Sequence, residues 1–331
     1  MSANAAGRLI QHYVDNYRRL PWREPPGGSG ADPYRVWLSE IMLQQTTVAT
    51  VKPRFERFVE RWPTITALAA ATDEEILSEW AGLGYYARAR NLVACARIVA
   101  DSGFPSTEAE LRQLPGVGAY SAAAIAAIAF DRRAAVVDTN VTRVIARLHG
   151  LARPDPKEVR ALVEDMIPAQ HPGDFAQAMM DLGATLCTPR SPDCQHCPLQ
   201  EDCTALACGR PESFPAPKTK KVRPERYGIA FWTERDGQVW LVRRPAKGLL
   251  GGMAALPGGE WTMDQSRAST ALASVRHVFT HFALELDVVE IGEPQGEGWW
   301  QPLARLEEAG LPTLYAKAAQ AVLKREQRLA A

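Results

Sequence analysis

Apolar residues recur at helical spacing through the first half of the chain. Val36, Trp37, Ile41 and Met42 show this spacing, and so do the apolar positions of FERFV at 55–59. Proline or glycine interrupts the pattern at 63, 82–84, 105, 115 and 154. We therefore expect residues from about 7 to 175 to be mostly helical.

The pattern changes after residue 208. Residues 209–226 carry four prolines and six basic side chains, a composition typical of an interdomain linker. Apolar runs at 229–232 and 239–242 flank Asp236-Gly237, which predicts a hairpin. We also expect an alternating strand at 282–288 and helices at 303–309 and 314–329. The predicted organisation is a helical domain at 1–208, a linker at 209–226 and an α+β domain at 227–331.

Composition excludes several classes of protein. The chain has 331 residues, 46% of them hydrophobic, which is enough for two domains with separate cores and argues against long disorder. The longest purely apolar run, 122–130, is too short to span a bilayer, and no secretory signal is visible. We expect a monomer in the cytoplasm, or at the nucleoid in a bacterium, without membrane attachment.

Charge is balanced overall but unevenly distributed. The 38 basic and 38 acidic side chains cancel, yet residues 151–208 hold four basic and nine acidic residues. Residues 209–247 reverse this with ten basic and four acidic residues. A local basic segment permits binding to nucleic acid or to a partner protein, although charge alone does not demonstrate it.

Four closely spaced cysteines are candidate metal ligands. Cys187, Cys194, Cys197 and Cys203 have the spacing C-x6-C-x2-C-x5-C, and a reducing compartment disfavours disulfides. Zinc and iron–sulfur clusters both accept four thiolates, so the number of ligands leaves both possible. The spacing itself resembles the [4Fe-4S] loop of the endonuclease III superfamily of DNA glycosylases. Cys95 and Cys208 are expected to be a core residue and a bystander.

A glycine-rich turn precedes an apolar run that favours a helix. In LPGVG at 114–118, Gly116 and Gly118 let the backbone approach a ligand, and the helix start beyond them suits a phosphate. Asp138 follows about twenty residues later in VVDTNV, where it could simply cap the next helix. Together, these segments resemble the helix–hairpin–helix and trailing aspartate of the same superfamily.

Two further segments, 40–51 and 80–91, resemble the MutY-type adenine DNA glycosylases. Glu40 falls within an apolar helical segment, where an exposed position on the helix is the ordinary alternative. Bifunctional members of the superfamily carry a lysine two residues after the second hairpin glycine, and here that residue is Tyr120. Tyrosine cannot form an imine, so we expect a monofunctional enzyme.

This resemblance implies a mechanism in which adenine is flipped from double-stranded DNA into a pocket. Glu40, with a raised pKa, would protonate adenine N7, and Asp138 would stabilise the sugar cation or form a transient adduct, as in two-carboxylate glycoside hydrolysis. The departures from the family pattern are Thr139 and Asp181, where glycine and glutamate are commoner, and Thr280, where serine is expected. The supporting positions implied are Tyr120 and Asn140 at the catalytic centre, Leu43, Gln45 and Tyr85 in the base stack, and Trp22, Arg23 and Asp181 around adenine.

Residues from 227 to the C-terminus resemble the Nudix-like domain of MutY proteins, which recognises 8-oxoguanine opposite adenine. Phe279, Thr280 and His281 occupy the position of the family's Phe-Ser-His loop, and His281 could instead be a core histidine. The segments 243–245 and 251–257 also fit the family pattern. The glutamates that bind magnesium in Nudix hydrolases are missing after Glu260, so we expect a domain that reads the base without hydrolysis.

The expected fold class is therefore multidomain. It combines an all-α helix–hairpin–helix glycosylase domain bearing a [4Fe-4S] loop with a smaller α+β Nudix-like domain. The expected partner is DNA containing 8-oxoguanine:A or G:A mispairs, and the linker is a candidate contact for another repair protein. The alternatives are an endonuclease III-like glycosylase/lyase, a thymine mismatch glycosylase, a non-catalytic iron–sulfur DNA-binding or electron-transfer protein and a nucleotide-pool hydrolase.

Overall fold

The computed structural model describes residues 4–28, 30–80, 83–217, 223–245, 248–265 and 270–330, without the side chains of 326–330. The chain forms two compact units. The first comprises Met1–Ala71 and Arg90–Thr219, and the second comprises Thr72–Ala89 and Lys220–Ala331. The change of unit at 219/220 falls within the predicted linker, of which residues 218–222 lie outside the described residues. The predicted domain boundaries themselves stay a prediction.

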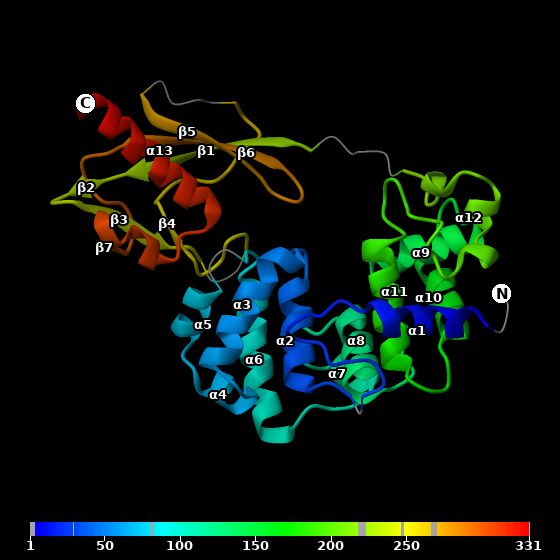
Figure 1. Ribbon diagram of the computed structural model, residues 1–331. Coiled ribbons are helices and arrows are strands. Elements are labelled where there is room, and N and C mark those ends of the chain that lie inside the picture. The colour runs from blue at the N-terminus through cyan, green and yellow to red at the C-terminus, as the bar shows by residue number, and fades with distance from the viewer. Residues whose placement is uncertain are drawn as a thin grey trace. The chain divides into compact units, whose positions relative to one another are not determined.

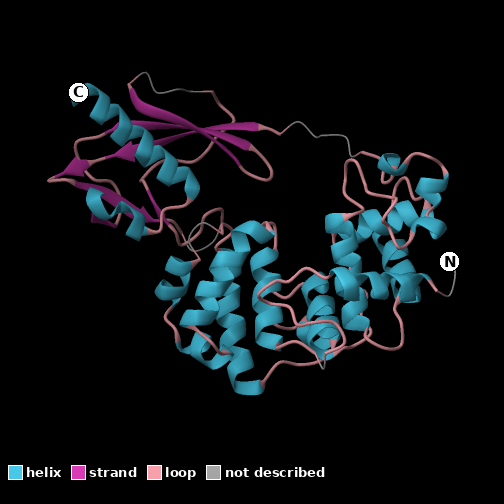
Figure 2. Ribbon diagram, viewed as in Figure 1, coloured by secondary structure: helices cyan, strands magenta, loops and turns pink. Residues whose placement is uncertain are grey.

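The first unit is built from helices, as the apolar spacing predicts (Figures 1 and 2). Helix α5 (Asp73–Glu79) and the first residues of α6 lie in the 72–89 segment, which belongs to the second unit. The α-helices of the first unit are α1 (Ala5–Asn16), α2 (Pro33–Leu43), α3 (Val48–Arg61), α4 (Ile65–Ala70), most of α6 (Ala87–Ser102), α7 (Glu108–Leu111), α8 (Ala119–Phe130), α9 (Thr139–His149), α10 (Pro156–Met166), α11 (Pro172–Thr185) and α12 (Thr204–Ala207).

Helix α8 is the buried centre of this unit. Nine consecutive residues, Ser121 to Ala129, are buried, and α2 and α11 pack against the helix. Its alanines let neighbouring backbones approach closely. A Cβ on Gly173 of α11 would lie 2.5 Å from the Ala127 carbonyl oxygen, so only glycine fits at that contact. The apolar run that is too short for a membrane is therefore a core helix.

The second unit contains two small sheets. Strand order is β1-β6-β5 in one sheet and β2-β3-β4 in the other, where β7 also pairs with β3. Helix α13 (Thr313–Ala330) packs against β5 (Figure 1). The strands are β1 (Glu225–Trp232), β2 (Glu234–Arg235), β3 (Gln238–Arg243), β4 (Ala254–Ala255), β5 (Ala271–Val278), β6 (Ala283–Glu290) and β7 (Gly298–Pro302).

Two expectations for this unit are wrong in part. The Asp236-Gly237 turn exists, but it joins β3 to the two-residue β2, whereas β1 pairs in parallel with β6. Strand β6 is buried at successive positions rather than at alternate ones, and its Leu284, Leu286 and Val288 share a core cluster with residues of α13. The segment Leu303–Ala309 is a kinked 3-10 helix, whereas the predicted helix at 314–329 is present as α13. Among the described residues, no helix combines the length and apolar character that a membrane span requires.

Candidate active site and cluster loop

Glu40 is a buried acid on helix α2. Asp32 caps this helix by accepting a hydrogen bond from the Tyr34 backbone N–H, and Pro33 occupies its first turn. Only 6% of Glu40 is exposed, so the alternative of an exposed glutamate is wrong. Burial raises the pKa of Glu40 to about 7, although hydrogen bonding from Tyr120 and the charge of Arg23 oppose the rise. The carboxyl group can therefore carry a proton near neutral pH.

Asp138 caps helix α9 and also belongs to the site. Its Oδ1 accepts a hydrogen bond from the Val141 backbone N–H at 2.6 Å, and its Oδ2 accepts one from Asn140 Nδ2 at 2.8 Å. Asp138 therefore does cap α9, as the alternative states. A capping carboxylate can also take the predicted catalytic role, so the two interpretations are compatible. One helix start orients the carboxylate, and the neighbouring amide fixes its second oxygen.

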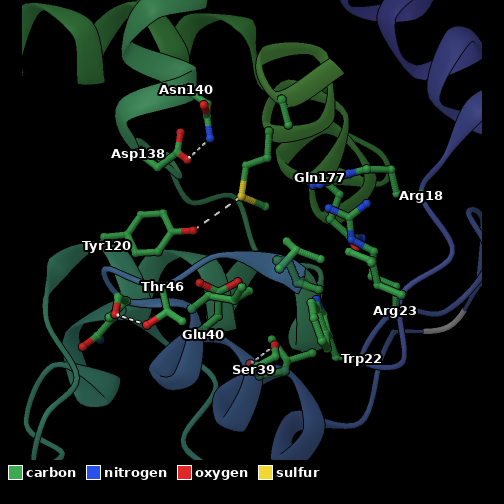
Figure 3. A pocket seen from close by; sticks show the side chains of 18 of the residues that line it. Arg18, Trp22, Arg23, Ser39, Glu40, Thr46, Tyr120, Asp138, Asn140 and Gln177 are labelled. Atoms are coloured by element: carbon green, nitrogen blue, oxygen red, sulfur yellow. Dashed lines mark hydrogen bonds between the residues drawn. The ribbon is translucent and has the colours of Figure 1, made fainter. Parts of the chain in front are cut away.

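Both carboxyl groups line one cavity of about 610 Å³, a size typical of ligand pockets (Figure 3). Residues from α2, the start of α8, the start of α9 and α11 meet there. Tyr120 points its hydroxyl toward the centre and donates a hydrogen bond to Met180 Sδ at 3.4 Å. The predicted residues that the cavity brings together are Trp22, Arg23, Glu40, Leu43, Gln45, Tyr120, Asp138 and Asn140.

Asp181 is not among the residues that line this cavity, and its predicted place around adenine stays a prediction. It is buried and pairs with Arg18 Nε and Arg23 Nη1, both at 2.5 Å. Those two arginines do line the cavity. Because Asp181 on α11 faces these arginines, its carboxylate holds two side chains of the cavity lining in place.

Gln177 is a pocket residue that sequence reasoning missed. It lies on α11, is 6% exposed, and donates from Nε2 to the Gly173 carbonyl at 3.4 Å. Its buried Oε1 has no hydrogen-bond partner among the described residues, which leaves one free acceptor in the wall. No local pattern marks Gln177 in the sequence. The other lining residues missed were Arg18, Leu20, Val36, Ser39, Gln44, Thr46, Val48, Ile128, Met180 and Ala184.

In the glycine turn before α8, Gly118 has the expected open backbone, whereas Gly116 packs against Asn91. Gly116 has φ +76°, and a Cβ there would lie 2.8 Å from the Asn91 Cβ. Gly118 is the N-cap of α8, without a side-chain cap, and no atom lies within 4 Å of where its Cβ would be. The helix start can therefore be approached by an anion such as a DNA phosphate.

The four predicted ligand cysteines line one small cavity. Arg147 holds the loop by donating to Cys187 Sγ at 3.3 Å and to the Thr188 carbonyl at 2.7 Å. Burial raises the pKa of Cys197 to about 11, and the neighbouring thiols add to the rise. Four thiolates gathered here need a cationic partner, which an iron–sulfur cluster provides. Cys95 is buried and Cys208 exposed, as expected of residues outside the ligand set.

Arg143 connects the cluster loop to Asn140. Its guanidinium donates to Asn140 Oδ1 at 2.9 Å, to the Gly183 carbonyl at 2.6 Å and to the Cys187 carbonyl at 2.8 Å. Asn140 in turn donates to Asp138. A continuous set of hydrogen bonds therefore runs from the backbone of a predicted cluster ligand to the Asp138 carboxylate.

The predicted reader residues form the turn between β5 and β6. Phe279 is half-buried, whereas Thr280 and His281 are exposed, so the alternative of a core histidine is wrong. Within the second unit, the Tyr85 hydroxyl lies 2.9 Å from the Thr280 hydroxyl. Tyr85 and Gln45, the predicted base-stack residues, both have left-handed backbones, a strained conformation common at functional sites. Within the 80–91 segment, residues 81 and 82 lie outside the described residues.

Comparisons with known proteins separate the alternatives. Residues 38–169 match the HhH-GPD superfamily base excision DNA repair protein model, 187–203 the iron-sulfur binding domain of endonuclease III and 228–321 the NUDIX domain. The fold resembles a thermostable thymine-DNA glycosylase, with TM-score 0.55, 29% identity and coverage of 61% of this chain and 95% of that one. It also resembles endonuclease III in a trapped covalent complex with DNA, with TM-score 0.52, 26% identity and coverage of 62% and 95%.

These matches define the class of protein as a helix–hairpin–helix DNA glycosylase with an iron–sulfur loop that binds a [4Fe-4S] cluster. A relative extends the likeness into the second domain. The adenine DNA glycosylase of Mus musculus is 34% identical across 87% of this chain, which covers 70% of the mouse protein. The chain belongs to the adenine DNA glycosylase family of base excision repair.

Proposed function

We propose that this protein removes adenine mispaired with 8-oxoguanine or guanine in double-stranded DNA. The observation that carries the proposal is a single pocket holding a buried acid, Glu40, and an oriented carboxylate, Asp138. Hydrolysis of an N-glycosidic bond needs both functions, because a purine leaves readily only when protonated and the sugar then gains positive charge.

The flipped adenine enters the pocket and receives the Glu40 proton at N7. The bond between C1′ and N9 then breaks, its electron pair remains with the purine, and Asp138 stabilises the cation on the sugar. Water adds to C1′ and passes a proton to the ionised Glu40 carboxylate, which restores the acid and leaves free adenine and an abasic site. Asn140 and Val141 hold Asp138 in place through the two hydrogen bonds at its carboxylate.

The pocket wall also offers a way to select adenine. The free Oε1 of Gln177 is a hydrogen-bond acceptor, and the exocyclic N6 amino group of adenine is a donor. Guanine carries an acceptor, O6, at the equivalent position and would face Gln177 unfavourably. Leaving a buried polar group unpaired costs about 1–3 kcal/mol, so this contact favours adenine.

The [4Fe-4S] cluster, held by Cys187, Cys194, Cys197 and Cys203, cross-links the loop when bound. Its loop is attached to the catalytic carboxylate by Arg143 and Asn140. The protein's own residues perform the steps at the base. Tyr120 stands where a lyase needs lysine, so the strand remains intact after the base has left.

The second domain reads the base opposite adenine through Phe279, Thr280 and His281. Two of these side chains are exposed at a turn, where they can reach DNA. The linker at 209–226 binds the DNA backbone or another repair protein through its basic residues, of which Lys218, Lys220 and Lys221 lie outside the described residues. We propose that the protein works as a monomer in the cytoplasm, at the nucleoid in a bacterium.

The test is single-turnover cleavage of end-labelled duplexes carrying 8-oxoguanine:A, G:A, G:T or thymine glycol. Each reaction is quenched with and without hot alkali. Alkali-dependent breaks at adenine alone, abolished in Glu40→Gln and Asp138→Asn, are expected. Breaks without alkali, or activity only on thymine or oxidised pyrimidine, would move the protein to one of its alternatives.

A further inference from the structure

An aromatic cluster lies behind the turn that contains Thr280 and His281. The Trp261 ring stacks on Phe279 with centroids 5.5 Å apart and planes at 27°. Phe282 completes the cluster at 4.9 Å from Phe279 and 6.2 Å from Trp261. Phe279 therefore has aromatic neighbours, whereas the next two side chains in the turn are exposed.

The backbone at 227–228 and 261–262 fixes the position of Trp261. Thr262 and Tyr227 exchange two backbone hydrogen bonds, at 2.8 and 3.0 Å. The ring then lies over Gly228, where a Cβ would approach Trp261 Cδ1 to 2.5 Å. Glycine at 228 is thus needed for the ring to approach β1 this closely.

Arg244 covers the ring of Trp261. Its guanidinium carbon lies 5.0 Å from the ring centroid, within the distance of a cation–π contact. Arg244 is itself held by the Tyr315 hydroxyl on α13, to which Nη1 donates at 2.9 Å. Trp261 therefore has backbone, glycine and arginine contacts that define a single orientation, and Phe279 packs on a fixed surface.

We propose that Trp261 is a positioning residue for discrimination between 8-oxoguanine and guanine opposite adenine. By holding the Phe279 ring, it fixes the turn and so the directions in which Thr280 and His281 meet the base. The turn is also closed by the Phe279 N–H, which donates to the Phe282 carbonyl at 2.8 Å. This inference rests on the proposed reader role of the turn and adds a residue that does not itself contact DNA.

The experiment measures single-turnover adenine release from 8-oxoguanine:A and G:A duplexes and takes the ratio of the two rates. Trp261→Leu should lower the ratio about two-fold to ten-fold, the range expected for loss of one aromatic pair. Trp261→Phe should restore most of it. Gly228→Ala should lower it too, because it displaces the ring while leaving tryptophan in the sequence.

The matched control is Trp240→Leu, which removes one ring of a tryptophan pair whose centroids are 5.3 Å apart in the other sheet. This variant should keep the wild-type ratio. An equal loss in Trp240→Leu and Trp261→Leu would overturn the inference, because general damage to the domain would then explain both.

Thr280→Ala separates this inference from the proposed function. If Thr280→Ala lowers the ratio and Trp261→Leu does not, the positioning role of Trp261 is wrong while the reader role stands. If Thr280→Ala leaves the ratio unchanged, the reader role fails, and the inference fails with it. In the double variant, Trp261→Leu should add little to the loss caused by Thr280→Ala, because both changes act on one turn.

Discussion

Replacing Glu40 by glutamine should abolish adenine release and, at neutral or higher pH, stabilise the protein. Burial holds the pKa of Glu40 at about 7 against an ordinary value of 4.5. Between these pH values the folded state keeps a proton that the unfolded chain has released, so wild-type stability falls as pH rises. At about 1.4 kcal/mol per unit, the loss reaches about 3 kcal/mol above pH 7. Glutamine cannot ionise and does not incur this loss.

The assay is urea unfolding of wild type and Glu40→Gln at pH 5 and pH 8, followed by helical circular dichroism. The stability gain of the variant should be small at pH 5 and about 3 kcal/mol at pH 8. Glu60→Gln, which changes an exposed glutamate on α3, is the control and should show no such pH-dependent gain. A variant no more stable than wild type at pH 8 would show that the folded protein does not oppose ionisation of Glu40.

Four other outcomes are expected. The single-turnover rate should fall about ten-fold per pH unit above pH 7, since Glu40 must be protonated to act as the acid; a flat profile to pH 9 would refute that role. Gln177→Leu should leave the urea midpoint unchanged or raised, because it removes an unpaired buried acceptor, yet slow adenine release at least ten-fold. Arg143→Ala should slow release about ten- to hundred-fold with iron still bound, because Asn140 loses its support; an unchanged rate would show that Asp138 is held without it. Cys197→Ser should lower iron per protein relative to Cys208→Ser, measured by metal analysis.

The sequence identifies the two carboxyl groups of the proposed mechanism better than it places the residues around them. Glu40 and Asp138 stand within recognisable local segments, and each segment folds into the helix expected of it. Gln177 and Arg143 have no comparable signal, because their roles arise only where α11 and α9 pack together. The side of α11 that Asp181 faces is likewise decided by packing, since its partners Arg18 and Arg23 are about 160 positions away in the chain.

The pairing of distant strands is a second feature that could not be predicted from the sequence. The Asp236-Gly237 turn is a local signal and is present in the structure. The partner of β1 depends on which apolar strand can cover Ala230 and Trp232, and that strand lies far along the chain. Periodicity describes the faces of a strand but contains no information about such a distant neighbour.

The parallel pairing of β1 with β6 also bears on synthesis of the protein. Glu225 pairs with Ala283 and Trp232 with Glu290, so β1 leaves the ribosome more than fifty residues before its partner. Until then, its hydrogen-bonding edge and the Trp232 side chain lack the cover they have in the folded sheet. A chain truncated between β1 and β6 would therefore consist of the helical domain and an unpaired β1 strand. Its free edge and exposed Trp232 would favour aggregation and degradation.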